Sequence, residues 1–559
     1  MPSYTISEIA AIVNGTLPND LPDDYPIRHL LIDSRKVTSA DNALFFCIVT
    51  QKNNGHNYIP ELYEKGIRYF VVSSLPENQE NYVNARFIVV NNTLVALQTL
   101  ATHHRHQFNI PVIGITGSNG KTIVKEWLFQ LLSPDKNIVR SPKSYNSQIG
   151  VPLSVWQMQP EHELAIFEAG ISEPEEMKLL QPIISPTIGI FTNIGTAHDK
   201  NFLNVRQKIG EKLNLFRRIE TLIYCSDNYD IQERIIKSGI QPQKCLFSWG
   251  FKHKADLTIK NIEKNQNHCI ISAVYKTENI SAEIPFSDDA SIENAIHCWA
   301  LMLYLEYPHE TINARLSILT PVAMRLELKA GINNCSVIND SYSSDLNSLN
   351  IALDFMCQQK QHSKKTVILS DILQSALTDN ELYNEIAKLL VSKGVTRFIG
   401  IGPSISKNEK LFPMEKSFFI DTDAFLAKVP GSAFHNETIL IKGARIYAFE
   451  QISRMLQQKS HETLLEINLN ALIHNLNFYQ NKLKKGTKVM AMVKALSYGS
   501  GGYEIANVLQ YHNIDYLAVA YADEGIELRK AKITTPIMVM NPEEESFDLM
   551  KKFNLEPEI

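Results

Sequence analysis

The sequence predicts an α/β fold built on parallel sheets, and three observations carry that prediction. The β-branched run at 112–116 is followed by a glycine-rich turn and a segment of helical character. Two further apolar runs, 164–167 and 187–191, each lead into polar residues. Farther along, the strand-like runs 364–373 and 397–402 alternate with a helical pattern, as in βαβ units. In an open parallel sheet, ligands collect beyond the carboxyl ends of such strands.

Length and composition limit the class of protein. At about 150 residues per domain, 559 residues predict three to four domains. A formal net charge of -5 gives no electrostatic case for binding nucleic acid. Seven cysteines without a CxxC pair fit reduced thiols. The sequence has no basic leader and no apolar run of about 18 residues, so we expect a cytoplasmic protein without membrane insertion.

The glycine-rich turn has the chemistry of a phosphate-binding loop. Backbone N–H groups at a helix N-terminus favour anions, a lysine reaches terminal phosphates, and a threonine hydroxyl holds Mg²⁺. Strict P-loop spacing would place glycine at Ile115, so the general motif fails by one position, and a glycine turn without chemistry is the alternative. The predicted loop comprises Gly117, Ser118, Asn119, Gly120, Lys121 and Thr122.

The first predicted domain, 1–108, holds a strand-like run that ends in polar residues, Asp33, Ser34 and Arg35. It closes with a helix that carries His103, His104 and His106. A metal site and cationic residues at a helix C-terminus are the two interpretations, and we prefer the second.

The second predicted domain, 109–319, contains the phosphate loop. A polar loop with Ser144, Tyr145 and Asn146 precedes the strand that ends in Glu168. A carboxylate at that position serves Mg²⁺ in Walker-type sites, although a solvated strand end is the alternative. The next strand leads to His198.

Four motifs in order, ITGSNGKT, KSYN, FEAG and TNIGTAH, follow a first domain that bears IDSR. Together they resemble the Mur ligases, and more narrowly the MurF type, over roughly residues 6–456. The resemblance implies a small α/β N-domain that binds a UDP-linked substrate, a central P-loop-like ATPase domain and a Rossmann-like C-domain. It implies an ATP-dependent ligase that joins D-alanyl-D-alanine to UDP-N-acetylmuramoyl-tripeptide through an acyl phosphate in peptidoglycan synthesis.

The same resemblance implies roles for individual residues. Lys121 would bind the γ-phosphate of ATP, Thr122 and Glu168 one Mg²⁺, and His198 a second. Lys212 would be a carbamylated lysine that acts as a metal ligand, although Lys208 lies one helical turn earlier and competes for this role. Further contacts to the nucleotide are implied for Asn294, Arg325 and Asp340, and contacts to the substrate for Asp33, Ser34, Arg35, Ser144, Tyr145 and Asn146.

Two departures from the family are Ile123, where threonine is usual, and Asn214, where an acidic residue is usual. In the third predicted domain, 320–457, Ser343 stands where asparagine is common. Lys442, Gly443 and Arg445 follow a strand there, and we weigh a solvated loop evenly against substrate contact.

The segment 464–559 changes character. VKALSYGSG resembles the cofactor segment of alanine racemases, a (β/α)8 barrel family, with Ser500 where histidine is usual. The resemblance implies that Lys494 would form a Schiff base with pyridoxal 5'-phosphate and that Tyr498 would contact the cofactor phosphate. A barrel needs about 250 residues, so we expect a partial barrel without racemase activity. Its presence favours a ligase that uses D-alanyl-D-alanine.

The sequence leaves two alternatives to a ligase that uses D-alanyl-D-alanine. One is another amino-acid ligase of the Mur and folylpolyglutamate synthetase type. The other is a nucleotide-binding scaffold without catalysis, which the set Lys121, Thr122, Glu168 and His198 argues against.

Overall fold

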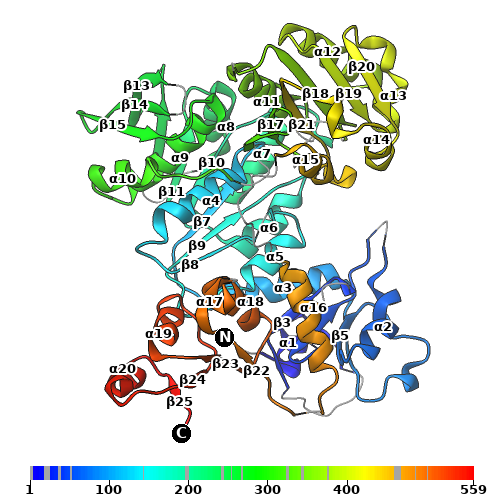
Figure 1. Ribbon diagram of the computed structural model, residues 1–559, viewed down its shortest axis with the longest axis vertical. Helices are drawn as coiled ribbons and strands as arrows, with labels where there is room; N and C mark the ends of the chain where they lie inside the picture. The colour runs from blue at the N-terminus through cyan, green and yellow to red at the C-terminus, as the bar shows by residue number, and fades with distance from the viewer. Residues whose placement is uncertain are drawn as a thin grey trace. The chain divides into compact units, whose positions relative to one another are not determined.

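A computed structural model describes most of the chain (Figure 1). The described residues are 4–17, 25–34, 40–50, 53–142, 144–195, 201–240, 245–252, 255–265, 268–322, 327–341, 345–359, 361–373, 375, 377–458, 467–484, 486–499 and 501–559. They divide into two compact units, one of residues 97–459 and one of residues 2–96 together with 460–559. An α/β architecture is confirmed in both.

The larger unit holds a sheet whose described strands number nine, in the order β15-β14-β13-β12-β11-β10-β7-β9-β8. Strands β8 to β12 run parallel, whereas β13, β14 and β15 pair antiparallel with one another. The strands are β7 (Val112–Thr116), β8 (Ile138–Arg140), β9 (Leu164–Glu168), β10 (Ile188–Phe191), β11 (Thr221–Cys225), β12 (Cys245–Gly250), β13 (Leu257–Lys264), β14 (Cys269–Tyr275) and β15 (Glu278–Ile284).

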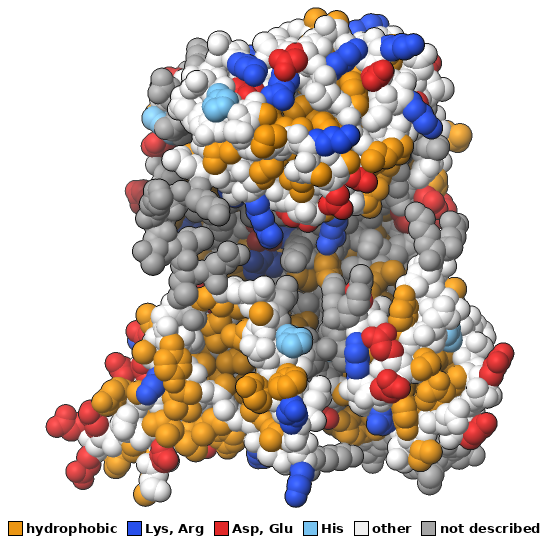
Figure 2. Space-filling view, turned by 45° about the vertical axis from the view of Figure 1, so that its right-hand side comes forward, with side chains coloured by type: hydrophobic (Ala, Val, Ile, Leu, Met, Phe, Trp, Pro, Cys, Tyr) orange, Lys and Arg blue, Asp and Glu red, His pale blue; other side chains and the backbone are white. Residues whose placement is uncertain are grey.

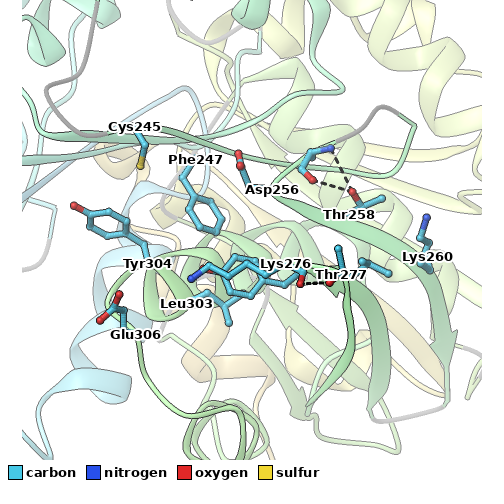
Figure 3. A pocket seen from close by; sticks show the side chains of 13 residues that line it. Cys245, Phe247, Asp256, Thr258, Lys260, Lys276, Thr277, Leu303, Tyr304 and Glu306 are labelled. Carbon is cyan, nitrogen blue, oxygen red and sulfur yellow. Dashed lines mark hydrogen bonds between the residues drawn. The ribbon is translucent and has the colours of Figure 1, made fainter.

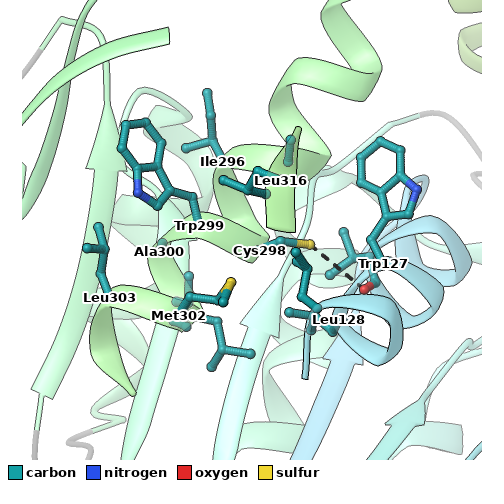
Figure 4. Packing of buried hydrophobic residues seen from close by; sticks show 14 of the residues in the cluster. Trp127, Leu128, Ile296, Cys298, Trp299, Ala300, Met302, Leu303 and Leu316 are labelled. Atoms are coloured by element: carbon teal, nitrogen blue, oxygen red, sulfur yellow. Dashed lines mark hydrogen bonds between the residues drawn. The ribbon is translucent and has the colours of Figure 1, made fainter. Parts of the chain in front are cut away.

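Helices cover both faces of this sheet. Their bounds are α3 (Thr93–Arg105), which begins in the smaller unit, α4 (Lys121–Leu132), α5 (Gly150–Val155), α6 (Glu176–Ile184), α7 (Val205–Leu213), α8 (Tyr229–Ser238), α9 (Asp289–Tyr304) and α10 (His309–Leu316). Alternate residues of β7 face opposite ways, because side chains of a strand alternate between its faces. Ile113 and Ile115 join the core under α4, α9 and α10, and Val112 joins the core under α5 to α8. Figure 4 shows Trp127 and Leu128 of α4 near Cys298 and Met302 of α9.

The same unit holds a second sheet, between residues 327 and 442. Its described strands follow the order β16-β17-β21-β18-β19-β20, and the pairs are parallel except β16 with β17. The strands are β16 (Glu327–Ala330), β17 (Ser336–Asn339), β18 (Lys364–Ser370), β19 (Arg397–Ile401), β20 (Glu415–Phe419) and β21 (Glu437–Lys442). The helices are α11 (Leu346–Gln358), α12 (Asp379–Ser392), α13 (Pro403–Lys407), α14 (Thr422–Lys428) and α15 (Glu450–Leu456).

The smaller unit begins with a pair of antiparallel strands and a capped helix. Thr5 and Glu8 form a capping box at the start of the first helix, which satisfies two of its free N–H groups. A parallel sheet follows in the order β3-β4-β5-β6. The elements are β1 (Tyr4–Thr5), α1 (Ile6–Ile12), β2 (Pro26–Ile27), β3 (His29–Leu31), β4 (Ala43–Phe46), α2 (Ile59–Glu64), β5 (Tyr69–Val72) and β6 (Arg86–Val89).

Residues 467–559 contribute another parallel sheet, whose described strands follow the order β22-β23-β24-β25. The strands are β22 (Met490–Met492), β23 (Tyr516–Val519), β24 (Ile537–Val539) and β25 (Glu556–Pro557). The helices are α16 (Leu469–Gln480), α17 (Lys494–Tyr498), α18 (Gly502–Tyr511), α19 (Ala522–Lys530) and α20 (Phe547–Lys552).

The surface carries both signs of charge. Figure 2 shows Lys and Arg side chains interspersed with Asp and Glu on the face in view. Among the described helices, none has the length and apolar character that crossing a membrane requires.

Candidate functional site

The predicted phosphate loop lies at the carboxyl edge of the large sheet. Strand β7 lies between β10 and β9 and runs parallel to both. Ile115 pairs with Glu168, and Thr116 pairs with Phe191, so the three strands end at the same level. The loop 117–120, Glu168 and the segment 192–195 therefore meet at one edge, as expected for parallel neighbours.

Hydrogen bonds join the phosphate loop to the segment after β10. The backbone N–H of Ser118 donates to the carbonyl oxygen of Asn193 at 2.8 Å, and that of Asn119 donates to Oδ1 of Asn193 at 2.9 Å. Thr192 Oγ1 donates to the carbonyl oxygen of Asn119 at 2.6 Å. At Gly117 φ is +148°, and a Cβ there would lie 2.0 Å from Thr192 Oγ1. Only glycine fits at this position, which explains why the predicted loop begins with Gly117.

Three lysines converge beside this loop. Lys121 Nζ donates to the carbonyl oxygens of Gly117 and Ser118 at 2.8 and 2.9 Å. Lys212 Nζ donates to the same Gly117 oxygen at 3.0 Å, and Lys208 Nζ donates to the carbonyl oxygen of Gly195. Burial lowers the pKa of Lys212 well below its usual range, and the charges of Lys121 and Lys208 lower it further. The loop therefore has the amino groups of three lysines beside it, and that of Lys212 favours the neutral form.

Side-chain oxygen atoms gather around Thr122, the residue after Lys121. Thr122 Oγ1 donates to Glu168 Oε2 at 3.0 Å and lies 3.1 Å from Ser144 Oγ. Ligands of Mg²⁺ lie about 2.0–2.1 Å from the ion, so neighbouring ligands of an octahedron are about 2.9 Å apart. The spacing and the hard oxygen chemistry of Thr122 and Glu168 therefore fit Mg²⁺. Glu168 is buried, so the solvated interpretation of this strand end is wrong.

The loop with Ser144, Tyr145 and Asn146 lies next to this carboxylate. The carbonyl oxygen of Asn146 accepts from the N–H of Gly170, two residues after Glu168, at 2.8 Å. A Cβ at Gly170 would meet the Asn146 side chain at 3.1 Å, so that side chain lies directly against the end of β9. The structure brings this predicted substrate segment beside Thr122 and Glu168.

Helix α9 supports the loop from the core. Asn294 is buried, and a Cβ at Gly120 would lie 2.2 Å from its Oδ1. One turn later, His297 Nε2 donates to the carbonyl oxygen of Thr192 at 3.0 Å, while its Nδ1 accepts from Trp249 Nε1 at 3.1 Å. Burial lowers the pKa of His297 to about 4, so the ring is neutral at pH 7. Sequence reasoning missed His297, although a polar residue within an apolar helix one turn after Asn294 was an available signal.

Asp340 follows β17 in the second sheet. Its Oδ2 forms a buried ion pair with Nζ of Lys442, the last residue of β21. The solvated-loop interpretation is therefore wrong for Lys442, because its side chain is fully buried and paired with a carboxylate.

Other predicted residues are placed elsewhere. Asp33 and Ser34 belong to the smaller unit, where the carbonyl oxygen of Ser34 accepts from Lys65 Nζ at 3.1 Å. Arg35, His198 and Arg325 lie outside the described residues, as do Ser343 and Ser500.

The histidine cluster of α3 needs a correction. His104 contacts the carbonyl oxygen of Met158 through Nε2 at 3.1 Å, and burial lowers its pKa to about 4. It is therefore a neutral core residue at pH 7 rather than a cation at a helix C-terminus.

Lys494 and Tyr498 begin and end α17, in which residues 495–498 have positive φ. Lys494 is exposed, and 65% of Tyr498 is accessible to solvent. Because both side chains are exposed, they do not enclose a bound pyridoxal phosphate as they stand.

A cavity of about 660 Å³ lies elsewhere on the large sheet (Figure 3). Phe247, Tyr304 and Lys276 are among its lining residues, and none of the predicted site residues is. The cavity is therefore distinct from the phosphate loop.

Comparisons with known proteins agree with this architecture. Residues 115–302 match the family model of the Mur ligase middle domain, and residues 467–559 match that of the alanine racemase N-terminal domain. The UDP-N-acetylmuramoyl-tripeptide--D-alanyl-D-alanine ligase of Bacillus subtilis (strain 168) is 27% identical over 81% of this chain and 98% of its own length. The protein of that name from Escherichia coli (strain K12) is 24% identical over 82% of this chain and 99% of its own length.

Solved structures show the same fold. A crystal structure of MurF from Acinetobacter baumannii superposes with a TM-score of 0.70 at 21% identity, over 81% of this chain and 98% of that one. The MurF ligase from Thermotoga maritima, solved in complex with ADP, superposes with a TM-score of 0.63 at 18% identity. The match covers 77% of this chain and 96% of that one. Over most of its length the chain is similar in sequence and in fold to MurF-type Mur ligases, and residues 467–559 match the alanine racemase N-terminal domain.

Proposed function

We propose that the chain is an ATP-dependent ligase that joins D-alanyl-D-alanine to UDP-N-acetylmuramoyl-tripeptide in peptidoglycan precursor synthesis. The observation that carries the proposal is the convergence of Lys121, Lys212 and the Thr122–Glu168 pair on one glycine-rich loop. The relatives named above supply the choice of substrates, since each bears the name of that ligase and matches over nearly its whole length.

The chemistry requires activation of the tripeptide carboxylate, which is a poor electrophile. A carboxylate oxygen attacks the γ-phosphorus of ATP, the bond to the β-phosphate oxygen breaks, and ADP leaves. The amine of D-alanyl-D-alanine then attacks the acyl carbon, inorganic phosphate leaves, and the amine loses a proton. Enclosure of the acyl phosphate away from water favours attack by the amine over hydrolysis.

The phosphate loop would hold the nucleotide. The N–H groups at the start of α4 would donate to a phosphate, and Lys121 would exchange its bonds to the Gly117 and Ser118 carbonyls for the γ-phosphate. Positive charge there stabilises the charge on the transferring phosphoryl group. Asn294, Arg325 and Asp340 are the proposed further contacts to the nucleotide.

Thr122 and Glu168 would hold one Mg²⁺, and His198 a second. Bound Mg²⁺ would neutralise negative charge on the phosphates. The structure gives Glu168 the burial and the neighbouring hydroxyl that such a ligand needs, whereas His198 lies outside the described residues.

Lys212 is the proposed carbamylated lysine. Its neutral amine would attack CO2 and release one proton, which converts a cation into a carboxylate-like ligand. A buried amine next to Lys121 and Lys208 favours the neutral form and so this reaction.

Substrate contacts are proposed for Asp33, Ser34 and Arg35 and for Ser144, Tyr145 and Asn146. The proposed domains are 1–108 for the UDP-linked substrate, 109–319 for ATP, 320–457 for the rest of the ligase and 464–559 for the racemase-like region. That last region is proposed to lack racemase activity, because Lys494 and Tyr498 are exposed.

The test is ADP release by the purified chain with ATP, Mg²⁺ and UDP-N-acetylmuramoyl-tripeptide, with and without D-alanyl-D-alanine. We expect release that requires the dipeptide and that falls by at least about 10³-fold in Lys121→Ala. Turnover with another amino acid in place of the dipeptide would indicate a different ligase of the family. ATP binding without any acceptor-dependent release would overturn the proposal in favour of a scaffold.

A further inference from the structure

Lys125 is a buried cation on the inner face of α4. It follows Thr122 by three residues, so both side chains lie on the same side of the helix. Its side chain has no solvent exposure, and its helical neighbours Val124 and Leu128 belong to the hydrophobic core. A buried ammonium group is costly unless it is paired, so its partners indicate why it is there.

The partners of Lys125 come from its own helix, from the residue after β8 and from the last residue of β9. Its Nζ donates to the carbonyl oxygen of Ser141 at 2.6 Å and lies 3.0 Å from Glu126 Oε1. The third partner is Glu168 Oε1, at 3.5 Å. Ser141 is itself joined to Glu168, because its Oγ accepts from the Glu168 N–H at 3.3 Å. Lys125 is thus anchored beside the carboxylate at the end of β9.

The two oxygens of Glu168 have different partners. Oε2 accepts from the Thr122 hydroxyl at 3.0 Å, and Oε1 faces Lys125. The Lys125 ammonium is bonded more closely to Ser141 and Glu126 than to Glu168. The ammonium group therefore places a positive charge beside Oε1, whereas the Thr122 hydroxyl contacts Oε2.

Among the residues that the structure describes, Lys125 and Arg140 are the cations that pair with Glu126 and Glu168. Glu126 Oε1 pairs with Lys125, and its Oε2 accepts from Arg140 Nε at 3.0 Å. Two cations thus face the two carboxylates of Glu126 and Glu168. Removal of Lys125 would leave two carboxylates with one cation, in a place where Glu168 is out of contact with water.

We propose that Lys125 is a positioning residue for the magnesium site: it holds the Glu168 carboxylate in the orientation that presents an oxygen beside Thr122. This inference rests on the proposed function, which assigns Thr122 and Glu168 to Mg²⁺. In this role Lys125 acts through Glu168 and not through contact with substrate or metal.

The test compares Lys125→Met with the unchanged chain in two measurements. The first is binding of Mn²⁺, as a spectroscopic substitute for Mg²⁺, to the protein with ADP, followed by electron paramagnetic resonance. The second is the Mg²⁺ concentration that half-saturates dipeptide-dependent ADP release. In Lys125→Met we expect the Kd for Mn²⁺ and the half-saturating Mg²⁺ concentration each to rise at least tenfold. The KM for D-alanyl-D-alanine should stay within threefold of the original value.

Two further variants make the result decisive. Lys178→Met removes a half-exposed lysine of α6 that pairs with Glu175, and it should leave both metal constants unchanged. Lys125→Met/Glu126→Gln removes the cation together with one of the two carboxylates, which preserves charge balance if the single variant fails to fold. It should still bind Mn²⁺ at least tenfold more weakly.

The outcomes separate the two proposals. Unchanged or tighter metal binding in folded Lys125 variants would overturn the positioning role and leave Lys125 a structural cation. Absence of dipeptide-dependent turnover in the unchanged chain would count against the proposed function instead, while Mn²⁺ binding would still decide the role of Lys125.

Discussion

Gly120 and Asn294 show how closely single residues depend on each other at this site. Gly120 adopts a left-handed conformation with φ of +82°, directly before α4. Such a conformation costs a residue with a Cβ about 1–2 kcal/mol. A methyl group at Gly120 would also approach Asn294 Oδ1 to 2.2 Å, so either the loop or the amide would have to move.

We therefore expect Gly120→Ala to weaken ATP binding at least tenfold in isothermal titration calorimetry. Gly239→Ala is the matched control, because Gly239 has a φ of +68° and a Cβ there would meet no atom within 4 Å. The control should lose only about 1 kcal/mol of stability and keep its ATP affinity. Equal affinity in both variants would show that Asn294 does not constrain the loop.

Lys212 gives a second prediction at this scale. Because its pKa is lowered by burial and by two neighbouring lysines, its amine is suited to react with CO2. We expect ligase activity to fall in buffer depleted of CO2 and to recover with bicarbonate. A carbamate signal from ¹³CO2 in nuclear magnetic resonance should be present in Lys208→Met and absent in Lys212→Arg. The reverse pattern would assign the carbamate to Lys208.

Sequence reasoning predicted residues whose role follows from their place in a strand, a turn or a helix start. Lys121, Thr122 and Glu168 are of that kind, and the structure brings them together. Lys125 and His297 were missed, because their partners Ser141 and Thr192 lie on other elements. A single sequence does not indicate which residues of different elements will contact each other.

At the scale of elements, α9 joins the nucleotide loop to the core and carries an unusual acid. Burial and, as the smaller cause, the charge of Asp289 one turn earlier together raise the pKa of Glu293 to about 7. Between its ordinary pKa of 4.5 and this value, the folded state binds more protons than the unfolded state. The free energy of unfolding therefore decreases as pH rises through that range, by an amount on the order of 3 kcal/mol.

We expect Tm to fall less between pH 5 and pH 8 in Glu293→Gln than in the unchanged chain, measured by scanning calorimetry. Glu310→Gln, at an exposed position of α10, is the control, and its Tm should change with pH as in the unchanged chain. The same change of Tm with pH in all three proteins would mean that Glu293 is ionised in the folded state from pH 5 to pH 8.

Elements with strong local signals were predicted well. The predicted strand, glycine-rich turn and helix that begin at residue 112 appear as β7, the loop and α4. Segment 494–498 was not predicted, because its left-handed turn at Ala495, Leu496 and Ser497 opposes the preference of residues with a Cβ.

At the scale of the whole molecule, the unit of residues 97–459 contains the proposed phosphate loop and Thr122, Glu168, Lys212 and Asn294. We expect a chain that ends at Gln458 to keep the kcat of the ligase within threefold of the full chain, measured by dipeptide-dependent ADP release. Lys121→Ala in the shortened chain is the control for background hydrolysis. A loss of more than tenfold would mean that the racemase-like region supports the ligase.

The sequence by itself determined the α/β class, the phosphate loop and the resemblance to both families, because these depend on local spacing of glycines, β-branched residues and a few polar groups. Tertiary structure decided which charges are buried and what they pair with. Lys442 with Asp340, Lys212 with the Gly117 carbonyl and Lys125 with Glu168 are examples. The physical reason is that the energy of a charge depends on its distance from solvent and from other charges, and parallel strands set those distances by joining segments far apart in the chain.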